Sequence, residues 1–206
     1  EGGKIEFIRD AELSLGDTVN WSINGSDSEI SLASDILFFE EAQLKVKFSG
    51  GGGTLKINDR VDLVGDGSNR LHLYGTSENR GTLVVTEEAW LTMNIGFERF
   101  RCRYIDGMLP SGLAISTDAF TILQQCDFVG QYPIGSEFEV FNNVSVSNSN
   151  FTATELRIDQ TDMDYNTATI SSSSFYGRKA LPRFLGGKMA VTDCHFLDNA
   201  RVRSAF

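Results

Sequence analysis

The chain has 206 residues, a formal net charge of −10 at pH 7, and 41% hydrophobic residues. That hydrophobic content is ample for a packed core and excludes global disorder, while no run of residues approaches the ~18 apolar residues of a membrane span. The negative charge argues against nucleic-acid binding in general and against adsorption to anionic membranes.

Pairs of short strands are predicted through the N-terminal half, because apolar residues there alternate with polar ones. The pattern begins with Ile5 and Phe7, continues to Ile23, and returns at residues 36–46, 55–63 and 83–93. Helices would show apolar spacings of three and four throughout, so pairs of strands joined by turns explain the pattern better. Polar segments predicted as turns separate the pairs at residues 24–29, 50–53, 65–69 and 76–81.

Residues 121–199 repeat one pattern four times. Each unit has a small or apolar residue, an apolar residue two positions later, Cys or Ser three positions after that, and Phe two positions further on. The four phenylalanines are 23, 24 and 21 residues apart, at Phe128, Phe151, Phe175 and Phe196. A period of this length is typical of a solenoid, in which stacked coils bury one continuous apolar interior.

The spacing of three within each unit breaks the strand alternation and predicts a corner. The corner pairs are Gln124-Gln125, Ser147-Asn148, Ser171-Ser172 and Thr192-Asp193. Such side chains hydrogen-bond nearby backbone, and Asn and Asp tolerate the left-handed conformation that a tight bend needs. The Phe column and the column of Cys126, Ser149, Ser173 and Cys194 are therefore predicted to face inward, with cysteine as a small core residue.

These patterns predict an all-β fold, a right-handed parallel β-helix (β-solenoid) of roughly 8–9 coils of about 23 residues. We expect a single domain over residues 1–206. The repeat resembles the parallel β-helix (pectin-lyase-like) superfamily, which includes pectate lyases, phage tailspikes and bacterial adhesin passengers. Open solenoid ends need caps, and no polar capping helix precedes Phe206, so we expect the chain to be a segment of a longer one.

A row of arginines is the first candidate binding site. Arg99, Arg101 and Arg103 alternate with Phe100 and Cys102, so they are predicted to share the outer face of one strand. The planar guanidinium group suits carboxylate and phosphate, which indicates a groove for an acidic glycan. The alternative is a solvated face whose charge is neutralised by neighbouring Asp and Glu.

Three segments interrupt the repeat and are predicted to be loops or insertions, at residues 108–112, 130–139 and 154–167. The last contains Asp159, Asp162 and Asp164. Clustered carboxylates bind calcium, and glycosidases place a carboxyl pair beside the bond that they cleave. A plain acidic loop is the favoured interpretation, because the spacing does not match an EF-hand loop. We predict no catalytic residue, metal ligand or cofactor, with Ca²⁺ entering only if the protein is a lyase.

Two further segments carry resemblances to members of this superfamily. Residues 178–183, Arg-Lys-Ala-Leu-Pro-Arg, are similar to the Arg- and Pro-containing segment of pectate lyases, although the spacing differs from RxPxxR. Those enzymes use Arg as a base and calcium held by Asp. Residues 186–189, Gly-Gly-Lys-Met, and 196–199, Phe-Leu-Asp-Asn, resemble the paired GGA(I/L/V) and FxxN motifs of chlamydial polymorphic membrane proteins, which are autotransporter adhesins.

The leading functional hypothesis is a non-enzymatic, surface-exposed or secreted β-helix that acts as an adhesin or passenger segment. We expect a host receptor or glycan as its partner, with no nucleic acid, and an extracellular or cell-surface location on a bacterial outer membrane or phage particle. The alternatives are a polysaccharide lyase or glycoside hydrolase acting on an acidic glycan, and a structural spacer of a phage tailspike. Self-association through the solenoid ends or as a trimer is also expected, and an exposed apolar strip along one side would favour the trimer.

Overall fold

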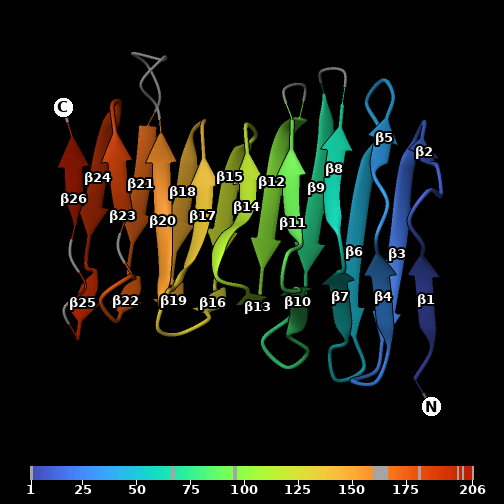
Figure 1. The fold of residues 1–206 in the computed structure, drawn as a ribbon, viewed down its shortest axis with the longest axis horizontal. Helices are drawn as coiled ribbons and strands as arrows, with labels where there is room; N and C mark the ends of the chain where they lie inside the picture. Colours follow the sequence, from blue (N-terminus) through green and yellow to red (C-terminus); the bar gives the residue numbers. More distant parts are fainter. Residues whose placement is uncertain are drawn as a thin grey trace.

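The computed structural model describes residues 2–65, 68–94, 97–159, 167–180, 182–198, 200 and 202–205. All strands in this part of the chain pair in parallel, and they form three sheets that the chain visits in turn. In Figure 1 the strands on the near side point up and those on the far side point down as the chain advances from one end to the other, which makes the coil right-handed. The predicted right-handed parallel β-helix is therefore confirmed, with about eight coils.

Each sheet runs the length of the molecule. Sheet A contains β1 (Lys4–Phe7), β4 (Glu29–Leu32), β7 (Thr54–Ile57), β10 (Gly81–Val85), β13 (Ile105–Leu109), β16 (Asp127–Gly130), β19 (Asn150–Thr152), β22 (Ser174–Tyr176) and β25 (His195–Leu197). Sheet B contains β2 (Leu13–Leu15), β5 (Ile36–Phe38), β8 (Arg60–Val64), β11 (Trp90–Met93), β14 (Gly112–Thr117), β17 (Ser136–Val140), β20 (Thr154–Asp159), β23 (Pro182–Leu185) and β26 (Arg203–Ala205). Sheet C contains β3 (Thr18–Asn24), β6 (Gln43–Ser49), β9 (Asn69–Tyr74), β12 (Phe97–Arg103), β15 (Phe120–Gln124), β18 (Val144–Ser147), β21 (Thr167–Ser171) and β24 (Lys188–Thr192).

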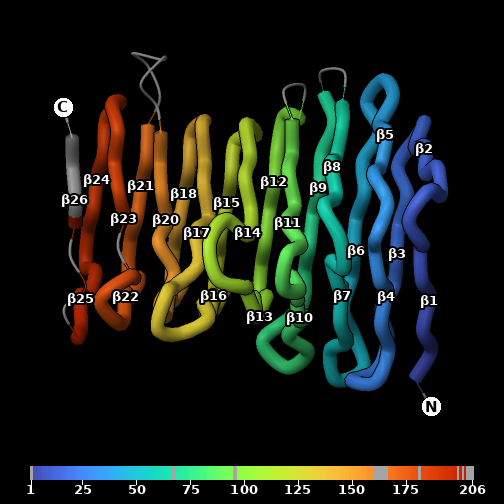
Figure 2. The backbone as a smooth tube through the Cα atoms, in the orientation of Figure 1, coloured from blue at the N-terminus to red at the C-terminus, as the bar shows by residue number. Residues whose placement is uncertain are grey.

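Successive coils lie side by side along the long axis, with the two termini at opposite ends (Figure 2). Strand register measures their length: equivalent residues are 21 positions apart between Asp106 and Asp127, and 28 positions apart between Thr54 and Thr82. Alternate residues of each strand point inward, and the inward ones form one hydrophobic core along the solenoid. No helix occurs in the described ranges.

The predicted Phe column lies inside the coils as stacked rings. Neighbouring ring centroids are 5.6 Å apart for Phe128 and Phe151, 5.0 Å for Phe151 and Phe175, and 5.3 Å for Phe175 and Phe196. The first three side chains are fully buried, while Phe196 is only partly buried because it belongs to the last coil of the column. Parallel stacking follows directly from the in-register pairing of β16, β19, β22 and β25.

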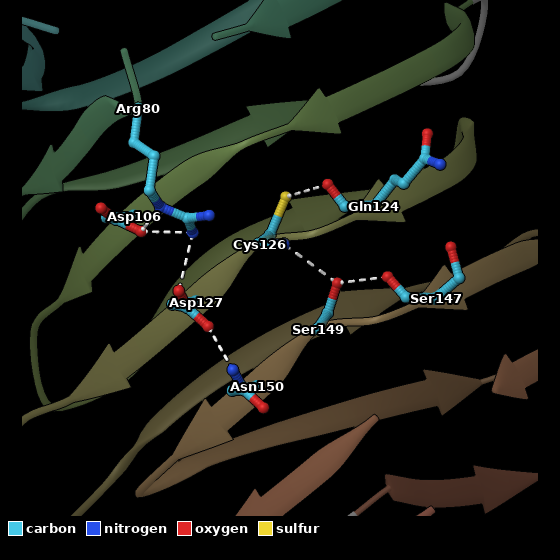
Figure 3. A network of polar contacts seen from close by, with 8 residues as sticks. All are labelled: Arg80, Asp106, Gln124, Cys126, Asp127, Ser147, Ser149 and Asn150. Atoms are coloured by element: carbon cyan, nitrogen blue, oxygen red, sulfur yellow. Dashed lines mark hydrogen bonds and ion pairs between the residues drawn. The ribbon is translucent and has the colours of Figure 1, made fainter. Parts of the chain in front are cut away.

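The Cys and Ser column satisfies backbone groups at the corner between sheets C and A (Figure 3). The Cys126 backbone N–H donates to Ser149 Oγ at 3.1 Å, and the Ser149 N–H donates to Ser173 Oγ at 3.2 Å. Each hydroxyl in turn donates to the carbonyl two residues before it, Ser147 at 2.9 Å and Ser171 at 2.7 Å. Small polar residues are needed here because a buried N–H without a partner is costly.

The second residue of every predicted corner pair has a left-handed backbone. The φ angles are 55° at Gln125, 49° at Asn148, 48° at Ser172 and 51° at Asp193. The corner prediction is thus confirmed at all four sites.

The three predicted loops are shorter than expected. Strand β13 extends to Leu109 and β14 begins at Gly112, and β16 and β17 leave only residues 131–135 between them. Residues Thr154–Asp159 form β20, not part of an insertion, because Thr154, Leu156 and Ile158 alternate inward and are buried. An insertion shifts the next repeat along the sequence, but the residues beside it can keep the alternation of period two that defines a strand.

Candidate ligand-binding face

A cluster of basic side chains covers the outer face of β6, β9 and β12 in sheet C. Parallel register aligns Lys45 with His72 and Arg101, and Lys47 with Tyr74 and Arg103. The intervening residues, such as Val46, Leu73 and Cys102, point into the core and are buried, so the basic ones must point outward. We call this surface the basic face and define it as Lys45, Lys47, Arg70, His72, Arg99, Arg101 and Arg103.

Glu98 is the single carboxylate among the outward residues of the sheet C strands as described, and it already has two partners. Arg70 holds it with two nitrogens, Nη2 at 2.7 Å and Nε at 3.1 Å from Oε2, while Arg99 Nη2 lies 3.7 Å from Oε1. Within the described part of the chain, the four remaining cations form no ion pair: Lys45, Lys47, Arg101 and Arg103. The face therefore carries uncompensated positive charge on a chain whose net charge is −10.

His72 lies at the centre of this face, between Lys45 and Arg101. Burial, and to a smaller extent the cations of Arg101, Lys45, Arg99 and Arg70, together lower its pKa to about 4. The imidazole is therefore neutral at pH 7, and its buried Nε2 atom has no hydrogen-bond partner. Because that nitrogen is buried, the attraction for an anion on this part of the face comes from the four cations around the ring.

The arrangement is a positively charged surface on three neighbouring strands of one sheet. Neighbouring strands are about 4.8 Å apart, so cations on β6 and β12 are separated by about 10 Å along the solenoid axis. Arg103 also lies over the Tyr104 ring, 5.3 Å from its centroid, and Arg99 lies 5.6 Å from the Phe120 centroid. These contacts restrict the guanidinium groups, which reduces the entropy lost when they bind a ligand.

The other predicted site residues lie elsewhere. Asp159 is at the end of β20 in sheet B, where Arg157 Nη2 contacts its carboxylate at 3.3 Å. The sheet C strand that follows it in the chain, β21, is three coils from β12. Asp162 and Asp164 lie outside the described residues. The structure thus gathers Arg99, Arg101 and Arg103 on one face and does not add Asp159 to them.

Sheet B carries a carboxylate cluster of its own that sequence reasoning missed. Glu139 lies 2.8 Å from Arg157, and Glu155 lies 3.8 Å from Arg183. Burial raises the pKa of both carboxyls, although the arginines act in the opposite direction. Strand register places Glu139 beside Arg157 and Glu137 beside Glu155, so this cluster is an ion-pair network on adjacent coils.

Cys102 and Cys126 are not candidate nucleophiles. Burial raises the pKa of Cys126 to about 11 and the pKa of Cys102 well above its ordinary value. Both thiols are therefore protonated at neutral pH, whereas nucleophilic attack requires the thiolate. Among the described residues there is also no group of three or more His, Cys, Asp or Glu side chains placed to hold a metal ion.

Sequence reasoning found the arginine row but missed Lys45, Lys47, Arg70 and His72. The signal was present, because each of the four lies at an outward position of β6 or β9, next to apolar residues that point inward. Their alignment depends on the exact coil length, which is 27 residues from Lys45 to His72 and 29 from His72 to Arg101. Both lengths exceed the spacing of 21–24 residues between the phenylalanines of the C-terminal half, so that spacing does not align these basic residues.

Comparison of the chain with models of protein families, with curated proteins and with solved structures found no match. The resemblance to parallel β-helix proteins therefore rests on the architecture itself. In the described residues no helix is long and apolar enough to cross a membrane.

Proposed function

We propose that this protein is a non-enzymatic β-helix adhesin or passenger segment, surface-exposed or secreted, that binds an acidic glycan on its basic face. The observation that carries the proposal is the concentration of six lysines and arginines around one carboxylate on an otherwise acidic chain. A carboxylated or sulfated polymer matches such a face, because each guanidinium binds an oxyanion through two parallel hydrogen bonds.

The net charge of the whole chain refines the choice of ligand. A long polyanion that wraps several faces would be repelled by the remaining acidic surface. A short acidic segment of a glycan that lies only across β6, β9 and β12 avoids this repulsion. Binding is expected to weaken as salt concentration rises, because charges this exposed are screened over a Debye length of about 8–10 Å.

The test is a titration of the chain with polygalacturonate, a sulfated glycan and a neutral glycan, with and without calcium. We expect the acidic polymers to bind without cleavage, and the double variant Lys45→Gln/Arg101→Gln to bind them at least about tenfold more weakly. Arg178→Gln/Lys179→Gln is the matched control, because it removes two exposed cations that lie outside the basic face. Equal loss in both variants, or no binding by the wild-type chain, would refute the proposal.

A lyase or hydrolase acting on an acidic glycan is the second candidate. It is favoured by Glu139 and Glu155, whose pKa burial raises, because an upward shift is the direction that suits a carboxyl to act as a general acid. Cleavage of polygalacturonate in the titration, abolished by Glu139→Gln, would replace the adhesin proposal with this one. If no glycan is bound or cleaved, the spacer of a larger assembly becomes the remaining alternative.

A further inference from the structure

A strip of exposed apolar side chains runs along the outer face of sheet A, away from the basic face on sheet C. Parallel register aligns one residue from each of six consecutive strands, β10 to β25: Val84, Met108, Val129, Thr152, Tyr176 and Leu197. The side chains of Met108, Val129, Tyr176 and Leu197 are 58%, 49%, 51% and 51% exposed. We call these six residues the apolar strip.

The strip is confined to the later coils. At the same position, the three earlier strands of sheet A carry Glu6, Ser31 and Lys56. The change from polar to apolar at Val84 is abrupt, so a general tolerance of apolar residues on this face does not explain the strip. Exposed apolar side chains gathered in one row, here interrupted by Thr152, mark a candidate interface.

A hollow deepens the strip near its N-terminal end. Its volume is about 290 Å³, and its lining is mainly apolar, with Val84, Met108, Leu109, Pro110 and Val129. Glu87 also lines it and accepts a hydrogen bond from the Gln131 amide at 3.2 Å. The neighbouring loop at residues 131–135 adds two exposed apolar side chains, Tyr132 at 73% and Ile134 at 64%. The surface therefore offers both a recess and projecting apolar groups, which a self-complementary interface requires.

A second row of outward residues on sheet A lies beside the apolar strip, and its carboxylates are paired with a cation. Its outward residues on β10 to β25 include two carboxylates, Asp106 and Asp127. Arg80 binds both of them, with Nε 2.7 Å from Asp106 Oδ1 and Nη2 2.7 Å from Asp127 Oδ2, and the Asn150 amide donates to Asp127 at 2.5 Å (Figure 3). Two copies of a chain with a net charge of −10 repel each other over most of their surface, and this is a face where that repulsion is weak.

We propose that the apolar strip is an interface at which two copies of this chain pack side by side, sheet A against sheet A. The regular spacing of side chains along the strip favours a second copy of this chain as the binding partner. Side chains in the strip recur at the strand spacing of about 4.8 Å over six coils, and a second copy presents the same spacing over the same length. An isologous contact between two copies uses one patch twice, whereas a cyclic trimer needs two different complementary patches, so a single strip favours a dimer and not the trimer that we expected from the sequence.

This interface is independent of the proposed glycan binding and would add to it. Because sheets A and C are different faces of the solenoid, pairing through sheet A leaves the basic face of each copy exposed. Two basic faces in one particle raise the apparent affinity for a multivalent glycan without any new contact.

The first test is sedimentation equilibrium of the wild-type chain over a range of concentrations. We expect a monomer–dimer equilibrium, and we expect the double variant Met108→Asp/Tyr176→Asp to weaken association by at least about tenfold, because each charge would be buried against an apolar partner surface. The matched control is Ile8→Asp/Phe39→Asp, whose side chains are 64% and 48% exposed but lie off the strip. The control should associate as the wild type does.

Three results would overturn the proposal: a wild-type chain that stays monomeric at all concentrations, a strip variant that associates as strongly as the wild type, or a particle of three or more copies. A second measurement does not depend on disruptive variants. In a Cys194→Ser background, Val129→Cys places a thiol near the middle of the strip, and oxidation should yield a disulfide-linked dimer. Phe39→Cys in the same background should not, and equal cross-linking of both variants would contradict a specific interface.

Discussion

The two halves of the solenoid make the same corner in different ways. Between sheets C and A, the early coils use loops at residues 25–28, 50–53 and 75–80, whereas the later coils turn through one or two residues, beginning with Tyr104. All four residues of the 50–53 loop are glycines with positive φ. The later corners use non-glycine residues in the left-handed region and satisfy the backbone with Cys and Ser.

The difference shows that the cross-section of the coil is constrained more strongly than the backbone path at its corners. Loops of four and six residues and a single left-handed residue all deliver the chain to the same register in sheet A. What is common to both halves is the inward column of apolar residues, which the stacking of coils requires. The corner chemistry is therefore where the halves should respond differently to substitution.

The largest effect is expected in the Phe stack of the later half. Phe151 is fully buried between Phe128 and Phe175, so Phe151→Ala should lower the free energy of unfolding by about 3–5 kcal/mol. Urea denaturation followed by circular dichroism measures the change. The exposed residue Phe39, changed to Ala, is the control, and an equal and small loss in both variants would contradict the stacked core.

The glycine loop of the early half should be nearly as sensitive to a single methyl group. Gly53 has φ +124°, and a Cβ there would overlap Ile23 Cγ2 and approach the carbonyl oxygen of Gly25. Gly53→Ala should therefore cost about 1–3 kcal/mol. Gly16→Ala is the control, because Gly16 has no positive φ and its Cβ would meet open space. Equal denaturation midpoints would show that the loop adapts freely.

The serine ladder of the later half should distinguish hydrogen bonding from packing. Ser149→Ala removes the acceptor of the Cys126 N–H and leaves that buried donor unsatisfied, at a cost of about 1–3 kcal/mol. Ser149→Cys should cost less, because Cys126 and Cys194 already occupy this column and donate from Sγ to the carbonyls of Gln124 and Thr192. An alanine variant as stable as the cysteine variant would show that volume alone matters at this position.

The same contrast explains how much could be predicted from sequence. In the later half, corners of nearly constant length keep the period visible, so Phe151, Ser149 and the turn at Asn148 could all be placed correctly. In the early half, loops of different length hide the period, and the alignment of Lys45 with His72 and Arg101 required the three-dimensional register. The apolar strip was missed for a related reason, since residues such as Met108 become a surface only when six coils are stacked.

The smallest expected effect is a dependence of stability on pH that arises at His72. Its folded pKa of about 4 lies below the ordinary value of 6.5 because of burial and the cations of Arg101, Lys45, Arg99 and Arg70. Lys47 and Arg103 add to the positive charge of the basic face, and Glu98 is the one carboxylate of the described residues on it. Above pH 6.5 the imidazole is neutral in both states and contributes no pH dependence. Between pH 6.5 and 4 the unfolded chain binds a proton that the folded chain does not, so the free energy of unfolding falls as the pH falls.

The variant His72→Gln isolates this contribution, because the other titrating groups are the same in both proteins and their contributions to the pH dependence of stability cancel in the difference. We expect the wild type to lose stability relative to the variant as the pH falls from 6.5 toward 4, by a modest amount because the ring is partly exposed and solvent screens its neighbours. A bound acidic glycan should raise the pKa of His72 by opposing the surrounding cations, which proton NMR can follow because the chain has only two histidines. A stability difference that stays constant with pH would show that the basic face does not act on His72, and a pKa unchanged by the glycan would place its binding elsewhere.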